Sequence, residues 1–397
     1  MSTPSVEEVQ GWVEELEALH GRIAPHFARV EPRRRALGYL RGLLSSVERK
    51  NGWQLAEQAG EATPHGTQRL LNTAQWDADS VRDELRDYVL ENLGPEDAVL
   101  VIDETGFLKK GEHSVGVKRQ YSGTAGRVEN AQVGVFLAYA SERGTAFIDR
   151  ELFLAEEWTH DKARCKAAGV PKDRKFLSRP QLAQLMLKRA FEAGVKASWV
   201  VADTVYASWK VRNLLEEHKQ PYVLAVPSNF MVRFISRSGI QQPHIATLFK
   251  NLDSTVWQRL SAGNGSKGER LYDWAWLSLR SLSMSHPALA PLIEPGFDRW
   301  FLARRNLDDS EELAYYIVFA PEHTTLAGVV RVAGMRWAIE TGFEALKGEA
   351  GLDEYETRSW TGWYRHITLS LLAHAFLSAI RAREAEKGAK QMLNLLN

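Results

Sequence analysis

The sequence predicts a protein of the α/β class, in which an all-helical N-terminal segment precedes a mixed-sheet core. Three observations support this prediction. Residues 1–95 repeat apolar side chains every three or four positions, as helices with one buried face do. From Ala98 on, short apolar runs alternate with helical stretches, which is typical of an α/β core. Residues 231–310 carry Gly, Ser and Trp among strand-like runs, which indicates a β-rich insertion.

The helical segment begins with one apolar stripe and continues through shorter helices. The stripe extends from Trp12 to Phe27, and Pro25 is expected to end or kink that helix. Further helices are expected over 37–47, 52–59, 67–76 and 80–93.

The two helices on either side of the turn Glu61–Gly66 permit a helix-turn-helix. In that arrangement Gln68, Arg69 and Asn72 would face a DNA groove. A plain helical bundle explains the same pattern equally well, so both interpretations stay open.

The core is predicted from apolar, β-branched and aromatic runs. Core strands are expected over 98–102, 133–139, 146–154, 198–202, 222–226 and 315–319, and insertion strands over 255–260, 269–279 and 299–304. Helices are expected over 181–193, 209–218, 325–346 and 361–386. These elements divide the chain into 1–95 (helical, DNA-binding), 96–230 (first part of the core), 231–310 (insertion) and 311–397 (C-terminal core helices).

Composition sets limits on the class of protein. Lys plus Arg and Asp plus Glu each total 50 among 397 residues, so any nucleic-acid contact must come from local basic patches. The single cysteine, Cys165, excludes an intrachain disulfide and a Cys-rich zinc site. The polar N-terminus does not resemble a signal peptide, and the apolar stretch Ile367–Ile380 is shorter than the roughly 20 residues of a membrane span. The cytoplasm is therefore the expected location.

Two aspartates each follow a short run of apolar residues that is expected to be a buried strand. Asp103 comes directly after Val99–Ile102, and Asp203 directly after Trp199–Ala202. The ends of buried strands are where active-site residues gather in α/β sheets. Two adjacent carboxylates repel each other unless a cation lies between them, and oxygen ligands select Mg²⁺ or Mn²⁺. The alternative is that each aspartate is an ordinary turn or helix-capping residue.

A third carboxylate is expected on the helix near residue 340. Spacings of four, four and three place four polar residues on one helix face: Arg336, Glu340, Glu344 and Lys347. A solvent-exposed face with intrahelical ion pairs is an equal alternative.

The combined motifs resemble the DDE-type transposases of bacterial insertion sequences, close to the IS seven-oh-one type. The resemblance covers nearly the whole chain. It is carried by Val101–Lys110, Arg119–Gly126, Val201–Tyr206, Arg336–Glu340, Gly351–Glu356 and Trp363–Thr368.

The resemblance implies an RNase H-like core in which Asp103, Asp203 and Glu340 bind Mg²⁺, with Mn²⁺ as a substitute and two ions in the site. It also implies that Arg336 and Lys347 contact DNA. The wider clan has a Tyr three residues before the Arg, where this chain has Ala333, so a hairpin route of excision is not implied.

The implied activity is metal-dependent cleavage and strand transfer at the ends of an insertion sequence, in a bacterial, nucleoid-associated protein. Its partners are the terminal inverted repeats and the target DNA, and joining two ends predicts a homodimer on DNA. Lys109 and Arg119, with Lys110 and Lys118, are expected to contact DNA phosphates, or else to be solvated lysines and arginines of a hairpin.

Alternatives to the transposase exist in other classes. One is a domesticated, non-cleaving DNA-binding protein on the same fold. Another is a carboxylate-pair hydrolase such as a glycosidase, whose activity survives chelation of metals. Most Trp residues of the insertion are expected in its own core. His113 and His160 are expected to be structural or surface residues.

Overall fold

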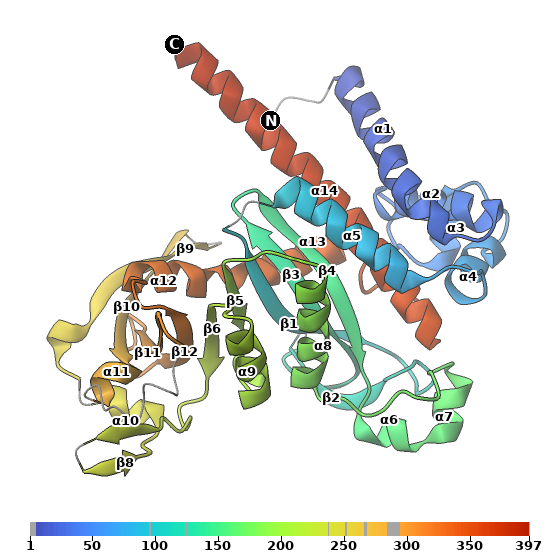
Figure 1. Ribbon diagram of the computed structural model, residues 1–397. Helices are drawn as coiled ribbons and strands as arrows, with labels where there is room; N and C mark the ends of the chain where they lie inside the picture. The colour runs from blue at the N-terminus through green and yellow to red at the C-terminus, as the bar shows by residue number, and fades with distance from the viewer. Residues whose placement is uncertain are drawn as a thin grey trace. The chain divides into compact units, whose positions relative to one another are not determined.

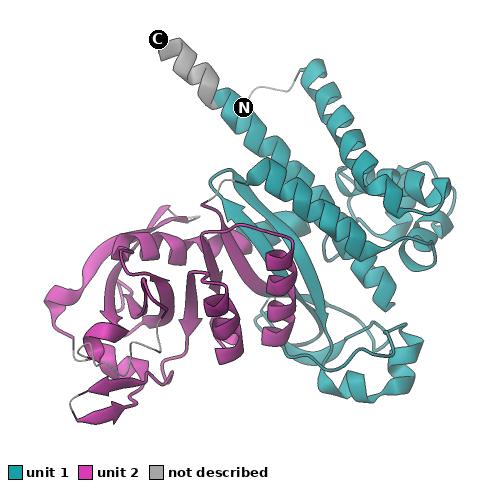
Figure 2. Cartoon of the chain, viewed as in Figure 1, with its two compact units in different colours: residues 1–95, 104–178, 340–397 teal, residues 96–103, 179–339 magenta. Residues whose placement is uncertain are grey.

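The computed structural model describes residues 5–94, 97–123, 125–236, 238–250, 252–265, 268–283 and 294–396. The chain forms two compact units, each assembled from separate stretches of sequence (Figure 2). Unit 1 comprises residues 1–95, 104–178 and 340–397, and unit 2 comprises residues 96–103 and 179–339.

The first stretch of unit 1 is helical, as predicted. Its helices are α1 (Val6–Ile23), α2 (Val30–Leu43), α3 (Gly52–Gln58), α4 (His65–Asn72) and α5 (Ala78–Leu93). A capping box of Ser5 and Glu8 begins α1, and the 3₁₀ turn η1 (Ala24–His26), which contains Pro25, follows its end. The expectation that Pro25 ends this helix is therefore confirmed.

The rest of unit 1 is an antiparallel strand arrangement covered by helices (Figure 1). Strand β3 (Arg127–Ser141) pairs with both β2 (Lys118–Ser122) and β4 (Gly144–Phe153). The long helix α14 (Trp360–Leu396) packs against β4, as does α5. The remaining helices are α6 (Glu156–His160), α7 (Lys162–Ala167) and α13 (Trp337–Ala350), whose first three residues belong to unit 2.

Unit 2 contains a mixed sheet in the order β1-β5-β6-β12-β11-β10-β9. The first three strands are parallel and the others antiparallel. The strands are β1 (Val99–Leu108, of which 99–103 lie in this unit), β5 (Trp199–Ala202), β6 (Tyr222–Val226), β9 (Gln258–Gly265), β10 (Gly268–Ser278), β11 (Phe297–Arg305) and β12 (Leu313–Pro321).

Helices and short elements complete unit 2. They are α8 (Arg179–Glu192), η2 (Thr204–Tyr206), α9 (Trp209–Glu217), β7 (Phe234–Ser236), β8 (Gly239–Gln241), α10 (Ile245–Lys250), η3 (Ser254–Val256), α11 (Leu279–Leu282) and α12 (Leu326–Met335). Helix α12 packs on β9, β5 and β6. Across the described residues, no helix combines the length and the apolar character of a membrane span.

The predicted strands of the insertion are present, and they extend the core sheet beyond β12. Strand β9 begins at Gln258 rather than at 255, because Asp253 caps a 3₁₀ turn over Ser254–Val256. Of the four tryptophans in residues 231–310, Trp274 and Trp300 are buried, whereas Trp257 and Trp276 are half-buried, so core burial was predicted correctly for two of them.

Two expected boundaries were wrong. Strand β1 continues through Asp103 to Leu108, because Thr105 and Phe107 are also buried. The single helix expected over 325–346 is two helices that meet at Arg336. A helix carbonyl at this junction has a partner outside the helix, since Arg270 donates to the Gly334 carbonyl at 2.9 Å.

Candidate active site

Two aspartates of unit 2 lie at matching positions of neighbouring parallel strands. Val99 of β1 is opposite Trp199 of β5, and this register continues to Ile102 opposite Ala202. Asp103 and Asp203 are the next residue on each strand. Because adjacent strands are about 4.8 Å apart, the register brings the two carboxylate-bearing residues together. This was the central expectation of the sequence, although Asp103 lies within its strand and not at the end.

Asp203 ends its strand by capping the turn that follows. Its Oδ1 accepts a hydrogen bond from the Thr204 amide at 2.7 Å, and its backbone carbonyl accepts from Tyr206. The turn-residue interpretation is therefore correct for the local structure. A carboxylate has about four lone-pair positions, so one capping bond leaves acceptor capacity for a further ligand.

Arg336 supplies a positive charge beside the aspartates. Its Nη1 is 3.6 Å from Oδ2 of Asp103, and both side chains are partly exposed. Arg270 supports this position: its guanidinium bonds the carbonyls of Ala262 at 2.5 Å and Gly334 at 2.9 Å, which ties the end of α12 to β9. Of the polar face predicted from residue 336 to 347, Arg336 is thus beside the first aspartate.

A cavity of 610 Å³ in unit 2 adjoins Asp203 and Arg336. Its lining combines cationic and aromatic side chains, including Arg270, Arg304, Tyr272 and Trp337. Tyr316 also lines it, and burial raises the pKa of this phenol although Arg304 and Arg336 act in the opposite direction. The phenol therefore stays protonated at neutral pH and is available as a hydrogen-bond donor. The arrangement suits an anionic, ring-containing ligand.

The other two predicted residues of this motif lie on α13. Glu340 is in the first turn, four residues after Arg336, and Lys347 is near the end of the helix. Burial lowers the pKa of the half-buried Lys347, while Asp353 opposes this shift. Glu344 is exposed.

The donor set at the two aspartates fits a hard divalent cation. Mg²⁺ commonly binds through one or two carboxylates and completes its shell with water and substrate phosphate. Among the residues that the structure describes, no three His, Cys, Asp or Glu side chains are grouped closely enough to hold one ion. His113 and His160 are exposed.

The predicted basic contacts separate into buried and exposed groups. Lys109 turns inward: its Nζ donates to the Tyr355 carbonyl at 3.0 Å and lies 3.5 Å from the centroid of the Tyr355 ring. Burial lowers the pKa of Lys109 to about 8. Lys110 and Arg119 are exposed, and Lys118 forms an ion pair with Glu157.

The three expected groove residues of helix α4 differ in their hydrogen bonds to other segments. Gln68 and Arg69 are exposed. Asn72 turns toward the segment before α14, where its Oδ1 accepts from Thr357 at 3.2 Å and from Ser359 at 2.7 Å.

The C-terminal family motif is part of the interior of unit 1. The Tyr355 hydroxyl donates to Gln132 at 2.8 Å and accepts from the Trp363 indole at 3.1 Å. His366 donates from Nε2 to the Gly351 carbonyl at 3.2 Å and accepts at Nδ1 from the Tyr39 hydroxyl at 2.7 Å. Tyr355, Trp363 and His366 therefore position the segment around them, whereas Asp353 and Glu356 of the same motif are exposed.

Sequence reasoning missed Arg270, Arg304 and Tyr316. All three lie on strands of the predicted insertion or the strand that follows it. The alternation of side chains along a strand could have indicated part of this set. Residues two apart share a sheet face, and Arg270 and Tyr272 line the same cavity.

Comparisons with known proteins identify the family of the chain. Residues 22–247 match a family model described as DDE superfamily endonuclease, and residues 173–376 match one described as transposase DDE domain. The chain is also similar to a protein of Microchaete diplosiphon described as "Probable transposase for insertion sequence element IS701". The two are 30% identical over 202 residues, which is 50% of this chain and 50% of the relative, so the match spans about half the length of that protein.

Proposed function

Because the chain belongs to the DDE superfamily endonucleases, we propose that it is the transposase of an insertion sequence. Its activity is metal-dependent cleavage of DNA at the ends of the element, followed by transfer of the freed 3′ end to target DNA. The observation that supports this most directly is the register that delivers Asp103 and Asp203 together, with Arg336 at 3.6 Å from Asp103.

Three carboxylates are assigned to the metal ions: Asp103, Asp203 and Glu340. The family match supports this assignment, as do the strand register and the place of Glu340 four residues after Arg336. These carboxylates would hold a pair of Mg²⁺ or Mn²⁺ ions, which would supply activation of the attacking oxygen and stabilisation of the leaving one.

The chain's own residues then orient the substrate. Arg336 neutralises Asp103 before substrate enters, and its partly exposed guanidinium is positioned to bind a phosphate. The cavity beside Asp203 adds Arg304 and aromatic rings, which suit a phosphate with its attached nucleoside. The mixed sheet around these residues is consistent with an RNase H-like core.

The partners follow from the reaction. The element's terminal repeats and the target DNA are the substrates, and Arg119 and Lys347 remain proposed DNA contacts. Two ends must be joined, so a homodimer on DNA is expected. The expected location is the nucleoid in the cytoplasm of a bacterium.

The first prediction concerns cleavage of a labelled duplex that carries the element's native end. The wild-type protein is expected to nick the boundary with Mg²⁺ or Mn²⁺ and to be inactive with EDTA. Asp203→Asn should lower the rate at least about a hundredfold, because it removes a charged ligand of the metal. Asp308→Asn, which changes an exposed loop aspartate of the same unit, should cleave at the wild-type rate.

Each contrary result has a definite meaning. Cleavage that persists in EDTA would contradict a metal-dependent site. Binding of the duplex without cleavage, unchanged by Asp203→Asn, would leave a DNA-binding protein without catalytic activity.

A further inference from the structure

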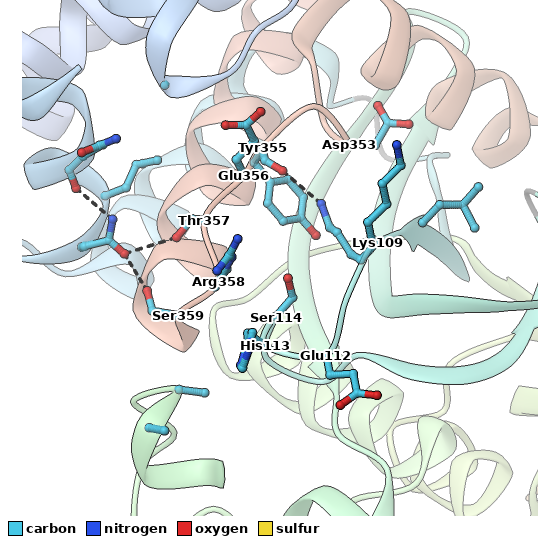
Figure 3. A pocket seen from close by; sticks show the side chains of 18 of the residues that line it. Lys109, Glu112, His113, Ser114, Asp353, Tyr355, Glu356, Thr357, Arg358 and Ser359 are labelled. Carbon is cyan, nitrogen blue, oxygen red and sulfur yellow. Dashed lines mark hydrogen bonds between the residues drawn. The ribbon is translucent and has the colours of Figure 1, made fainter. Parts of the chain in front are cut away.

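A second and larger cavity lies wholly within unit 1 (Figure 3). Its volume is 1060 Å³, at the upper end of the roughly 300–1,000 Å³ of small-molecule pockets. Four parts of the chain form most of its walls: the helix pair α3 and α4, residues 108–114 at the end of β1 and after it, residues 158–168 around α6 and α7, and the segment 353–359 before α14. None of the carboxylates assigned to catalysis lines it.

The walls are held in place by contacts between these parts. Segment 357–360 is fixed on three sides: Thr357 and Ser359 donate to Asn72, the Val115 amide donates to the Arg358 carbonyl at 2.9 Å, and the Trp360 amide donates to Ala168 at 2.8 Å. The Lys109 contact with Tyr355 joins the loop after β1 to the same segment. The cavity is therefore a preformed feature of the unit.

Cationic side chains outnumber acidic ones around the cavity, whose lining also includes the carboxylate of Glu112. Asp353 and Glu356 act on Lys109, since both raise the pKa that burial lowers, so their negative charge faces an internal lysine. Lys110 and Arg358 are both exposed and line the cavity. Arg164 adds a third cation, held by stacking 3.8 Å from the Trp158 ring and by a bond from its Nη2 to the Glu112 carbonyl at 2.8 Å.

The helix pair adds groups that bind the rest of a nucleotide chain. Gln68 lines the cavity from the exposed face of α4. A glutamine amide is suited to bidentate contact with adenine in the major groove. Trp53 of α3 also lines the cavity and is 55% exposed, an aromatic surface that unit 1 does not use in its core.

We propose that this cavity is part of a second DNA site, which contacts individual groups of the duplex of the element's end, apart from the catalytic carboxylates. Lys110 and Arg358 contact its phosphates, and Gln68 contacts a base edge. Recognition then belongs to a composite groove that includes the segment before α14, and not to the helices of residues 1–95 alone. The inference rests on the proposed function for the identity of the DNA.

The test is equilibrium binding of the full chain to two labelled duplexes across a salt series. One duplex carries the element's end, and the other has the same composition in scrambled order. Lys110→Gln and Arg358→Gln should each lower the affinity of the protein for both duplexes by the same factor. Each should also reduce the slope of log affinity against log salt concentration by about one. Lys172→Gln, an exposed lysine of the same unit outside the cavity, should change neither quantity.

Gln68→Ala has a different expected signature. It should keep the salt slope and lower the preference for the native end by about five- to hundredfold. Unchanged thermal melting of each variant would show that the fold is kept.

Wild-type affinity and slope in both Lys110→Gln and Arg358→Gln would overturn the proposal. The proposal would also be overturned if Gln68→Ala lost the preference for the native end while Arg358→Gln bound with wild-type affinity. Helix α4 would then recognise DNA without the segment before α14. The cleavage assay separates the second DNA site from the proposed catalysis. If the protein nicks DNA normally and its binding does not change in the cavity variants, only the second DNA site is contradicted. Groove-dependent binding without nicking contradicts only the proposed catalysis.

Discussion

At the scale of single residues, two histidines of α14 are buried without charge. Burial lowers the pKa of His366 to about 3 and that of His374 to about 4. His366 has hydrogen-bond partners at both ring nitrogens, whereas Nδ1 of His374 is buried without one. Both folded-state pKa values lie below the ordinary value of 6.5. Their contribution to stability is therefore complete above pH 6.5 and is lost as the pH falls.

This gives a prediction about acid stability. Below pH 6.5 each imidazole should cost a little over 1 kcal/mol of unfolding free energy per pH unit, until its folded-state pKa is reached. His374→Leu should keep the stability at pH 7 and reduce the loss between pH 6.5 and 4. Urea unfolding at several pH values measures this. His113→Gln, at an exposed position, is the control, and an equal acid loss in His374→Leu and the wild type would contradict the assignment.

The sequence predicted the two aspartates because each follows an apolar run that specifies a buried strand. It did not predict the inward turn of Lys109. The partner of Lys109, Tyr355, is 246 positions away, and no local pattern reports so distant a contact. For the same reason the hydrogen bonds from Thr357 and Ser359 to the amide oxygen of Asn72 could not be predicted.

At the scale of elements, α12 lies very close to β9. A Cβ added at Gly334 would meet the Ala262 carbonyl oxygen at 2.0 Å, so only glycine permits this approach. Arg270 bonds the carbonyls of both residues. The contact fixes the end of α12, two residues before Arg336.

Gly334→Ala is therefore expected to push α12 away from β9. Overpacking should cost about 1–3 kcal/mol of unfolding free energy, and displacement of Arg336 should slow cleavage as well. Gly348→Ala is the matched control, because nothing lies within 4 Å of its added Cβ in helix α13. It should raise stability by about 0.5–1 kcal/mol. Similar unfolding curves for the two variants would contradict the close contact.

Most elements were predictable, since apolar periodicity reports burial directly. The wrong boundaries occur where contacts between distant residues, and not the local sequence pattern, determine where an element ends. Strand β1 extends past Ile102 because Thr105 and Phe107 are buried, although Asp103 and Glu104 interrupt the apolar run. At the helix break at Arg336, the Gly334 carbonyl accepts from Arg270, which is 64 positions away.

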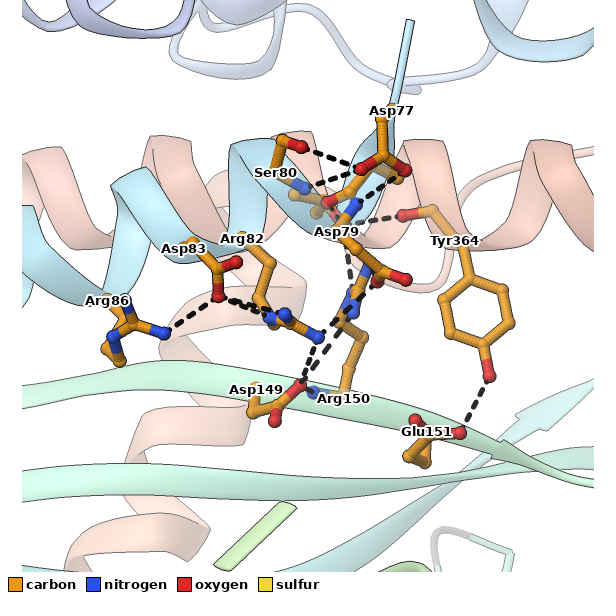
Figure 4. Close-up of polar contacts among 12 residues, drawn as sticks. Asp77, Asp79, Ser80, Arg82, Asp83, Arg86, Asp149, Arg150, Glu151 and Tyr364 are labelled. Atoms are coloured by element: carbon orange, nitrogen blue, oxygen red, sulfur yellow. Dashed lines mark hydrogen bonds and ion pairs between the residues drawn. The ribbon is translucent and has the colours of Figure 1, made fainter. Parts of the chain in front are cut away.

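At the scale of the whole molecule, a buried arginine joins the three stretches of unit 1 (Figure 4). Arg150 of β4 is 0% exposed and bonds Asp79 of α5 at 2.8 Å and Thr368 of α14 at 2.9 Å. Its guanidinium also lies 3.7 Å from the buried Asp149, which Arg82 contacts at the same distance. The network is thus a polar connection between segments far apart in sequence.

Removal of Arg150 should be strongly destabilising. Arg150→Ala deletes these bonds and removes one of the positive charges beside the buried Asp149 carboxylate. It should lower the free energy of unfolding by about 3–5 kcal/mol. Arg127→Ala, at a 76% exposed position on β3, should change stability by less than about 0.5 kcal/mol. Denaturant unfolding compares the two. A loss below about 1 kcal/mol in Arg150→Ala would contradict a structural role for the network.

The sequence divided the chain into contiguous segments, because composition and periodicity change along the chain. Which segments pack into one unit depends on pairs such as Arg150 and Thr368, 218 positions apart. An arginine in a strand with an Asp before it and a Glu after it gives no sign of complete burial. The composition of the units was therefore beyond what the sequence predicts.

The discontinuity of unit 1 has a consequence for synthesis on the ribosome. Strand β4 and helix α5 emerge early, yet α14, which covers them, belongs to residues 340–397. At typical translation speeds the ribosome takes roughly ten to thirty seconds to pass from residue 178 to residue 340. During that interval the apolar face of β4 lacks its cover and is available to chaperones. A chain that ends before α14 would lack the helix that covers β4 and α5, and it could not complete unit 1.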